Sequence, residues 1–271
     1  MLRVSFQGER GAYSEAAARS FFDKKIETVP LPTFSDVMEY TENDKTDYSI
    51  LPVENSLEGS VGESYDLLYS TKIYAVGETY FRIRHCLIGL GPLDKIDTVY
   101  SHPQALGQCR NFIQKHHIKT VPAYDTAGSV QIVKDLNKKN VACIASKTAS
   151  EIYGIPIIMQ GIEDNSNNYT RFLILSKEKT GETGSDKTSI IFSVKHEAGA
   201  LFRVIEKFHD YKINLTKIES RPTKTTPWEY NFYVDFDGHE KNKTISEMLK
   251  KIKKDALFLK ILGSYPRAEL S

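Results

Sequence analysis

The stretch Asn167-Asn168-Tyr169-Thr170-Arg171-Phe172-Leu173-Ile174-Leu175 runs from polar residues into an apolar segment, and polar residues follow again. A short β-rich run between polar segments is typical of a buried strand. Such a strand fixes a hydroxyl, Thr170, beside a guanidinium, Arg171. Because adjacent strand residues point to opposite faces, the two groups need not contact the same ligand atoms. An arginine fork fits a carboxylate, so Arg171 is a candidate anion anchor, although a Thr-Arg pair alone more often only begins a strand.

The whole chain has 271 residues, a length that suits two domains, with 40% apolar and 26% charged residues. Its 36 basic and 35 acidic side chains give a formal net charge of +1. This balance provides no field that would hold nucleic acid or an anionic membrane. No apolar run approaches the length that spans a bilayer, and the N-terminus begins with a strand pattern, not a signal sequence. We therefore expect a cytoplasmic protein with no nucleic-acid or membrane partner.

The common signatures of metal and cofactor sites do not occur in the sequence. Cys86, Cys109 and Cys143 are far apart and form no C-x-x-C pair, so we expect reduced thiols. The seven histidines show no metal-ligand spacing, and the P-loop, G-x-G-x-x-G and G-x-S-x-G patterns are missing. The sequence predicts neither a metal site nor a cofactor.

Polar loops follow several predicted strands and lead into helices. The strand at 2–6 precedes a loop with Gly8 and Gly11, whose backbone can approach an anion at the start of the next helix. The strand at 48–53 leads into the polar segment 54–62. This strand–loop–helix order is typical of α/β proteins, in which ligand groups collect at the carboxyl ends of strands.

A third junction of this kind follows the predicted strand at 99–100. Ser101, Gln104 and Gln108 are spaced by three and four residues, so we predict that they share one helical face. His102 lies beside a proline and has no evident acid partner, which favours a capping or packing role. Thr126-Ala127 precedes a further helix, whose free N–H groups are another candidate anion site.

The order of elements predicts a first domain at 1–178, a linker at 179–187 and a second domain at 188–271. Within the first domain, a lobe at about 76–158 is inserted between two parts of the other lobe, at about 1–75 and 159–178. Two such lobes form a cleft, with Thr170 near the crossing. Residues 177–187 include no apolar side chain, as expected of a linker. The second domain has the ferredoxin-like order βαββαβ.

A set of short motifs resembles the prephenate dehydratase family, of the monofunctional bacterial type, over nearly the full chain. The motifs are GERGAYSEAA at 8–17, LPVENS at 51–56, SHPQA at 101–105, YGIP at 153–156 and NYTRF at 168–172, with GAL at 199–201 and ESRP at 219–222 of an ACT regulatory domain. Each motif is modest, but the full set in this order is highly specific. Glu9 departs from the family, in which proline is frequent at this position.

The resemblance implies an enzyme of L-phenylalanine biosynthesis that removes water and carbon dioxide from prephenate to give phenylpyruvate, without a cofactor or metal. It implies a two-lobed α/β fold similar to periplasmic binding proteins, and a homodimer or homotetramer inhibited by L-phenylalanine at paired ACT domains. The implied catalytic residues are Thr170, Glu54, Asn55, Ser101 and Gln108. The implied substrate-binding residues are Arg171, Ser56, Gln104, Gly11, Ala12, Tyr13, Thr126, Ala127 and Phe172. The implied phenylalanine-binding residues are Gly199, Ala200, Leu201, Asn214, Glu219, Ser220, Arg221 and Pro222.

The chemistry of this reaction leaves the proton donor open between two residues. The departing ring hydroxyl is a poor leaving group, so it needs a proton or a strong hydrogen bond. By resemblance Thr170 is the donor, but a threonine hydroxyl is a very weak acid and would have to act through a concerted hydrogen bond in a dry cleft. Glu54 is the alternative if closure of the lobes raises its pKa.

Two other functions stay open at this point. The chain could prefer arogenate, the amino analogue of prephenate, because the discriminating contact concerns only a keto or an amino group. A non-catalytic amino-acid sensor or solute-binding protein of the same fold is the alternative from another class. A sensor does not need Thr170, and the missing signal sequence argues against a solute-binding protein.

Overall fold

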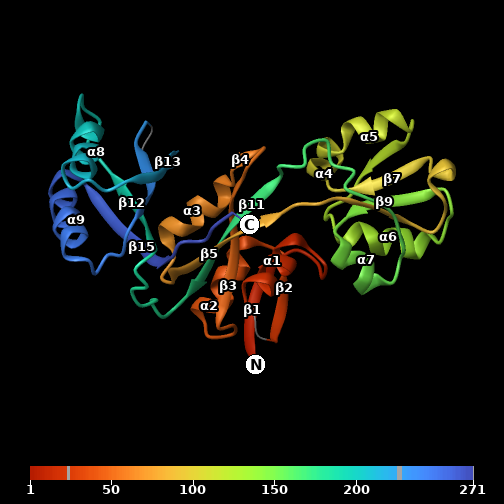
Figure 1. Cartoon of the computed structure of the whole chain (residues 1–271), viewed down its shortest axis with the longest axis horizontal. Helices are drawn as coiled ribbons and strands as arrows, with labels where there is room; N and C mark the ends of the chain where they lie inside the picture. The colour runs from red at the N-terminus through yellow and green to blue at the C-terminus, as the bar shows by residue number, and fades with distance from the viewer. Residues whose placement is uncertain (23–24, 225–227, 271) are drawn as a thin grey trace. The chain divides into compact units, whose positions relative to one another are not determined.

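The computed structural model describes residues 1–22, 25–224 and 228–270 (Figure 1). The chain forms two compact units. The first unit contains Met1–Val37, Glu54–Gly59 and Phe81–Thr170, and the second contains Met38–Val53, Ser60–Tyr80 and Arg171–Ser271. Residues 225–227 and 271 of the predicted second domain lie outside the described residues. Both units combine helices and strands, which confirms the predicted α/β class.

The chain begins with a strand–helix–strand unit. Strands β1 (Leu2–Gln7) and β2 (Ile26–Leu31) pair in parallel, and α1 (Tyr13–Phe21) connects them. Ala17 and Ala18 give α1 a buried face made of small side chains, so the helix can lie close to the strands. The loop between β1 and α1 carries the GERG motif at the carboxyl end of β1.

The first unit also contains a five-stranded sheet. Its order is β10 (Ile157–Gln160), β6 (Cys86–Gly89), β9 (Val141–Ala145), β7 (Thr98–Ser101) and β8 (Lys119–Pro122). Strand β7 is parallel to β8 and β9, whereas β6 is antiparallel to β9 and β10. All five residues of β9 are buried, as expected for a central strand that is covered on both faces.

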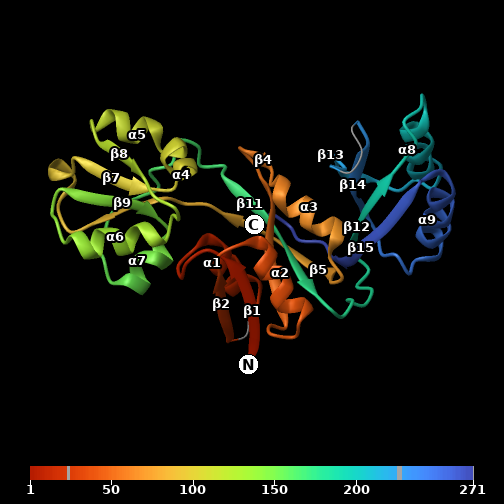
Figure 2. The ribbon, with the colours of Figure 1, turned by 180° about the vertical axis from the view of Figure 1, so that it is seen from behind.

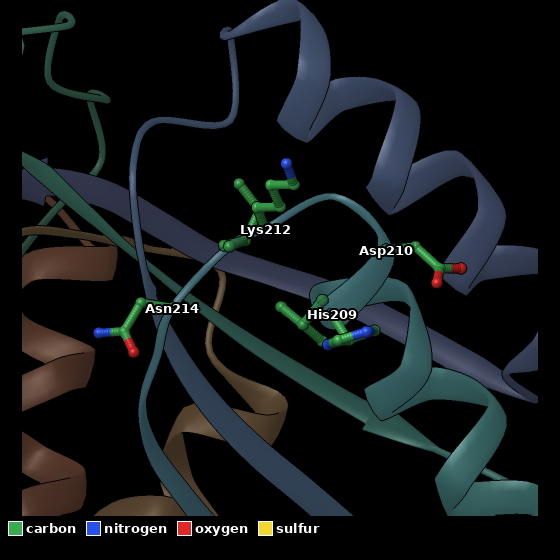
Figure 3. A pocket seen from close by; sticks show the side chains of 6 residues that line it. His209, Asp210, Lys212 and Asn214 are labelled. Carbon is green, nitrogen blue, oxygen red and sulfur yellow. The ribbon is translucent and has the colours of Figure 1, made fainter.

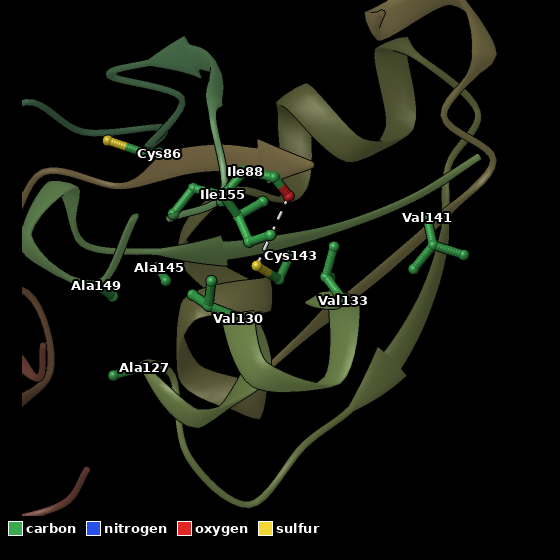
Figure 4. Packing of buried hydrophobic residues seen from close by; sticks show 10 residues of the cluster. All are labelled: Cys86, Ile88, Ala127, Val130, Val133, Val141, Cys143, Ala145, Ala149 and Ile155. Atoms are coloured by element: carbon green, nitrogen blue, oxygen red, sulfur yellow. Dashed lines mark hydrogen bonds between the residues drawn. The ribbon is translucent and has the colours of Figure 1, made fainter. Parts of the chain in front are cut away.

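Helices cover both faces of this sheet. Helices α6 (Gly128–Leu136) and α7 (Lys147–Tyr153) pack on one face, where Val130 and Cys143 belong to the cluster shown in Figure 4. Helices α4 (Pro103–Gln108) and α5 (Arg110–Lys115) pack on the other, where Ala105 and Ile144 belong to a second cluster. The neighbours Cys143 and Ile144 thus face opposite cores because strand side chains alternate. A short 3₁₀ helix, η1 (Leu93–Lys95), precedes β7.

The second unit contains most of α2 (Phe34–Glu42), all of α3 (Gly62–Ser70) and most of three neighbouring strands. These are β3 (Tyr48–Asn55), β11 (Tyr169–Ser176) and β5 (Tyr74–Arg82), and the short β4 (Gly59–Ser60) pairs with β3. Most residues of these strands belong to the second unit, and their ends reach into the first. Strand β11 is the segment quoted first from the sequence. Its burial over Arg171–Ser176 confirms the predicted buried strand.

A four-stranded antiparallel sheet completes the second unit (Figures 1 and 2). Its order is β13 (Leu215–Pro222), β14 (Tyr230–Asp237), β12 (Asp186–Ser193) and β15 (Phe258–Pro266), with α8 (Ala200–Asp210) and α9 (Lys243–Asp255) between strands. Phe192 and Phe236 share one core with Val204 of α8 and Met248 of α9, so both helices cover the same face. This arrangement confirms the predicted ferredoxin-like order βαββαβ.

Several local features were not predicted from the sequence. Strand β10, helix α5 and the two-residue β4 are additional elements. Strand β12 begins at Asp186, inside the segment predicted as linker, because Asp186 and Lys187 already pair with β15. No helix of the described ranges is long and apolar enough to cross a membrane.

Candidate functional site

Asn55, at the carboxyl end of β3, fixes the geometry around Thr170. Its Oδ1 accepts hydrogen bonds from the backbone N–H groups of Leu57 (2.9 Å) and Glu58 (3.0 Å), so the oxygen of the amide must face that turn. Its Nδ2 therefore points the other way and donates to Asn168 Oδ1 (2.8 Å) and Thr170 Oγ1 (3.1 Å). The buried amide of Asn55 thus orients Thr170.

The Thr170 hydroxyl accepts this hydrogen bond from Asn55 and keeps its own proton. Within the described part of the chain, the structure records no acceptor for that proton. A hydroxyl can donate one hydrogen bond while it accepts another. Thr170, which is partly exposed at the start of β11, can therefore donate a hydrogen bond to a further acceptor.

Gln108, at the end of α4, joins the same group of side chains. Its Oε1 accepts from Asn168 Nδ2 (2.9 Å) and lies 2.9 Å from His85 Nε2. Ser56 Oγ donates to the Asn167 carbonyl (2.7 Å) and accepts from the Tyr169 N–H (2.9 Å), so the 54–58 turn is tied to the 167–170 segment. The structure thus brings together the predicted residues Asn55, Ser56, Gln108 and Thr170.

His85 was not singled out from the sequence, yet it extends this group. Its ring is 2% exposed, with Nε2 near Gln108 and Nδ1 2.9 Å from the hydroxyl of Tyr13. Burial lowers the pKa of His85, while the hydrogen bond to Gln108 and the charge of Glu163 oppose this shift. A single histidine before an apolar strand belongs to no motif, so no sequence signal indicated it.

Tyr13 is placed differently from its predicted role. Its hydroxyl lies between His85 Nδ1 and the Arg84 carbonyl (3.0 Å), and burial raises its pKa well above the usual value. The ring packs edge-on against His85. The expectation that Tyr13 binds substrate is therefore corrected for its hydroxyl, which protein groups already engage.

The helical face predicted for Ser101, Gln104 and Gln108 is not formed. Ser101 is the last residue of β7, fully buried, and its Oγ donates to the Ile144 carbonyl (2.7 Å). Gln104 is exposed on α4, and its N–H donates to His102 Nδ1 (3.3 Å). The predicted capping role of His102 is thus confirmed. Ser101 holds two strands together, so its hydroxyl proton is not available to a substrate.

The predicted anion loop at Gly8–Gly11 is closed by the protein itself. The Gly11 N–H donates to Glu15 Oε2 (2.6 Å), and the Gly11 carbonyl accepts from Ser146 Oγ (2.5 Å). The Ala12 N–H donates to the Glu9 carbonyl (3.0 Å). The expectation that Gly11 and Ala12 offer N–H groups to a substrate is therefore corrected.

The helix start at Thr126-Ala127 and the strand residue Phe172 need the same correction. Asp125 Oδ1 accepts from the Gly128 N–H (2.8 Å), so a carboxylate of the chain already caps α6. Ala127 is buried in the core, and the Thr126 carbonyl accepts from Ser129 Oγ (2.6 Å). Phe172 is 2% exposed and serves as a core residue.

Arg171 lies in a buried ion cluster of the second unit. Its side chain is 5% exposed, and its Nε is 2.7 Å from Glu78 Oε2. Its two terminal nitrogens bond Asp235 Oδ2 and Tyr265 Oη. Lys187 completes the cluster with Nζ 2.7 Å from Glu78 Oε1. The two carboxylates already balance the guanidinium, so its predicted role as the substrate anchor is corrected to a structural one.

Glu54 directly precedes Asn55 on β3, and its side chain is partly buried. Because strand side chains alternate, it points to the opposite face from Asn55. Thr170 shares a hydrogen bond with Asn55. Among the described residues, no group of three or more His, Cys, Asp or Glu could hold a metal ion.

The predicted phenylalanine-binding residues lie around β13 and the start of α8. Gly199 caps α8 with φ +79°, a left-handed conformation that favours glycine, while Ala200 is buried and Leu201 packs on the core. Glu219 Oε2 accepts from Ser60 Oγ (2.7 Å), and Arg221 lies 3.6 Å from Asp66. Ser220 and Pro222 alternate with them on β13 and are exposed.

An open pocket of about 550 Å³ lies beyond the end of α8 (Figure 3). Its lining residues are Phe208, His209, Asp210, Lys212, Ile213 and Asn214. Asn214 is one of the predicted phenylalanine-binding residues, and its Nδ2 donates to Asp237 Oδ2 (3.0 Å). Figure 3 shows the Asn214 side chain pointing away from those of His209 and Asp210. This pocket does not bring together the predicted set.

The fold and these sites define a class: an α/β part, in which amide side chains orient a hydroxyl, joined to a ferredoxin-like domain. A family model described as prephenate dehydratase matches residues 4–180, and one described as ACT domain matches residues 188–254. The chain belongs to the prephenate dehydratase family.

Curated relatives cover almost the whole chain. A bifunctional chorismate mutase/prephenate dehydratase of Aquifex aeolicus is 37% identical over 99% of this chain and 75% of its own length. An arogenate dehydratase/prephenate dehydratase of Arabidopsis thaliana is 39% identical over 98% of this chain and 73% of its own length. The chain thus spans about three quarters of the length of these relatives.

Solved structures are similar over nearly the full chain. A protein described as a novel type of quorum quenching acylase, GqqA, has a TM-score of 0.91 at 29% identity, with 98% of each chain covered. A prephenate dehydratase of Arthrobacter aurescens in complex with L-Phe has a TM-score of 0.90 at 26% identity, covering 98% of this chain and 90% of the other. Both likenesses extend over the two parts of the chain.

Proposed function

We propose that this chain is a prephenate dehydratase in which Thr170 donates a hydrogen bond to the departing ring hydroxyl. The observation that carries the proposal is the direction of one hydrogen bond: Asn55 Nδ2 donates to Thr170 Oγ1, which keeps the threonine proton for another acceptor. The choice of prephenate as the substrate rests on the family and its relatives. The choice of Thr170 as the donor rests on the hydrogen bonds of the site.

The reaction needs little from the protein besides this donor and a fixed orientation. The bond between the ring and its carboxylate breaks, and its electron pair enters the ring as carbon dioxide leaves. The bond to the ring hydroxyl breaks at the same time, and the oxygen takes up one proton and departs as water. Formation of the aromatic ring drives the process. A weakly acidic threonine serves here because it shares its proton as the bond breaks.

The test compares three variants in an assay that follows phenylpyruvate formed from prephenate. Thr170→Val keeps the shape of the side chain but has no hydroxyl, and we expect kcat to fall by about 100- to 10,000-fold. Thr170→Ser keeps the hydroxyl and serves as the matched control, with a far smaller loss. Glu54→Gln tests the alternative donor. Wild-type turnover by Thr170→Val would refute the role of Thr170.

Preference between prephenate and arogenate is tested with the same enzyme and both substrates. One curated relative carries both activities in its name, so each is a reasonable substrate for this chain. We favour prephenate because the Aquifex aeolicus relative is named for it. If arogenate has the higher kcat/KM, this preference is wrong.

Regulation by L-phenylalanine completes the proposal. The Arthrobacter aurescens structure contains L-Phe, and this chain has an ACT domain, so we propose that phenylalanine inhibits the enzyme as a homodimer or homotetramer in the cytoplasm. We assign residues 1–178 to the catalytic domain, 179–187 to the linker and 188–271 to the ACT domain. Assays with added phenylalanine, and light scattering for the mass, check these points.

Four buried thiol and hydroxyl groups among the described residues do not favour an acylase activity. The thiols of Cys86 and Cys143 are buried, and burial raises their pKa values to about 11 and about 12. Such thiols are not reactive nucleophiles. The hydroxyls of Ser101 and Ser146 donate to backbone carbonyls, so neither is paired with a general base.

A further inference from the structure

We propose that His85 is a positioning residue whose Nε2–H holds the amide of Gln108, at the far end of the hydrogen-bonded side chains that lead to Thr170. Six side chains form this sequence of hydrogen bonds, named here the Tyr13–Thr170 chain: Tyr13, His85, Gln108, Asn168, Asn55 and Thr170. The inference rests on the proposed role of Thr170 and adds the residue that holds the opposite end of the chain.

The direction of each hydrogen bond follows from the backbone at Asn55. Two backbone N–H groups fix Asn55 Oδ1 as an acceptor, so Nδ2 donates to Asn168 Oδ1. The other end of the Asn168 amide, Nδ2, must then donate to Gln108 Oε1. The amides of Asn55, Asn168 and Gln108 therefore each have one orientation in which every donor faces an acceptor.

The atom that faces His85 is therefore an acceptor. Gln108 Oε1 lies 2.9 Å from His85 Nε2, so that nitrogen must carry a hydrogen. Burial favours the neutral ring of His85, which has one N–H, so Nδ1 is bare. Tyr13 then donates its hydroxyl proton to Nδ1 across 2.9 Å. The network thus selects one tautomer of His85, with the hydrogen on Nε2. No single contact of the ring determines this tautomer; it follows from the whole set of hydrogen bonds.

Tyr13 also allows the ring to gain a proton without disturbing Gln108. If Nδ1 were protonated, it would donate to the Tyr13 oxygen, and the tyrosine proton would turn to the Arg84 carbonyl, 3.0 Å away. Nε2–H donates to Gln108 in both states. The nearby carboxylate of Glu163 accepts from the backbone N–H of His85 and not from the ring. The hydrogen bond that holds Gln108 Oε1 thus depends on the Nε2–H group and not on the charge of His85.

Two substitutions of His85 distinguish the role of Nε2 from that of Nδ1. The amide nitrogen of glutamine in His85→Gln takes the position of Nε2 and keeps a donor for Gln108. The shorter asparagine in His85→Asn reaches only the position of Nδ1 and leaves Gln108 Oε1 without that donor. We expect kcat of His85→Asn to fall about 10- to 100-fold, because a buried polar group loses a partner. His85→Gln should recover most of the activity at an equal melting temperature.

The ¹⁵N spectrum of histidine-labelled wild-type enzyme gives a readout that does not depend on turnover. It should show a protonated Nε2 and a bare Nδ1 for His85. A protonated Nδ1 with a bare Nε2, or equal activities of the two variants, would overturn the proposal. If wild-type enzyme forms no phenylpyruvate but shows the expected tautomer, the proposed function fails while the positioning by His85 stands.

Discussion

At the scale of single residues, the direction of hydrogen bonds decides which groups are available for chemistry. Thr170 can donate because Asn55 donates to it, whereas the hydroxyls of Ser101 and Tyr13 are engaged by protein groups. The carboxylate of Glu15 is also engaged by protein groups. It is fully buried and accepts hydrogen bonds from the Gly11 N–H, from Thr28 and from Arg19. It thereby closes the loop that the GERG motif forms.

We predict that Glu15 makes folding stability depend on acid pH. Burial raises the pKa of Glu15, but the hydrogen bonds from Gly11, Thr28 and Arg19 outweigh it, so the folded pKa lies below the usual 4.5. A depressed carboxyl pKa stabilises the fold above the unfolded pKa, and this contribution is lost as the pH falls through the folded value. Glu15→Gln should therefore lower the free energy of unfolding by about 1–3 kcal/mol at pH 7 and by progressively less below about pH 4.5.

Urea denaturation of both proteins across this pH range measures the effect. The control is Glu151→Gln, which removes a carboxylate that is 61% exposed and paired with Lys147 at 3.6 Å. An exposed pair of this kind contributes little. A difference between wild type and Glu15→Gln that stays constant from pH 7 to pH 3 would contradict the prediction.

At the scale of elements, close approach of backbones positions the loop after β1. Gly11 has φ +90°, and a Cβ at this residue would lie 2.6 Å from the Cα of Ala149 in α7. The neighbouring atom is backbone, which cannot move aside as a flexible side chain does. The contact between this loop and α7 therefore requires glycine for two separate reasons, its conformation and its size.

Gly11→Ala should destabilise the protein by about 2–4 kcal/mol, because the substitution adds both backbone strain and a steric overlap. Thermal unfolding measures the change. Gly181→Ala is the matched control: no atom lies within 4 Å of the added Cβ, and its backbone is not left-handed, so its melting temperature should stay close to wild type. Equal melting temperatures for the two variants would show that the loop relaxes at no cost.

At the scale of the whole molecule, charges that are far apart in sequence meet in the second unit. Glu78 of β5 accepts from Arg171 of β11, from Lys187 of β12 and from the backbone N–H of Ala268. Asp235 of β14 balances the other side of Arg171. Four strands are thus joined through one buried cluster with two positive and two negative charges, and β11 is the strand that carries Thr170.

Removing one charge from this cluster should be costly. We expect Glu78→Gln to lower the free energy of unfolding by about 3–5 kcal/mol, because it leaves a buried cation without its partner. The double variant Glu78→Gln/Lys187→Met removes one charge of each sign and should be less destabilised than Glu78→Gln alone. Urea denaturation of wild type, both single variants and the double variant gives this comparison. Strictly additive losses would mean that the two residues do not act as a pair.

The sequence by itself determined most of the order of elements, the α/β class, the ferredoxin-like domain and the family. These features follow from local periodicity and short motifs, which can be recognised within a short segment of the sequence. Through the resemblance of its motifs to the family, the sequence also indicated Asn55, Gln108 and Thr170. Only the tertiary structure decided which groups are engaged: Arg171 bonds Glu78 and Asp235, which are 93 and 64 residues away. His85 joins the site in the same way, because partners distant in sequence leave no local pattern.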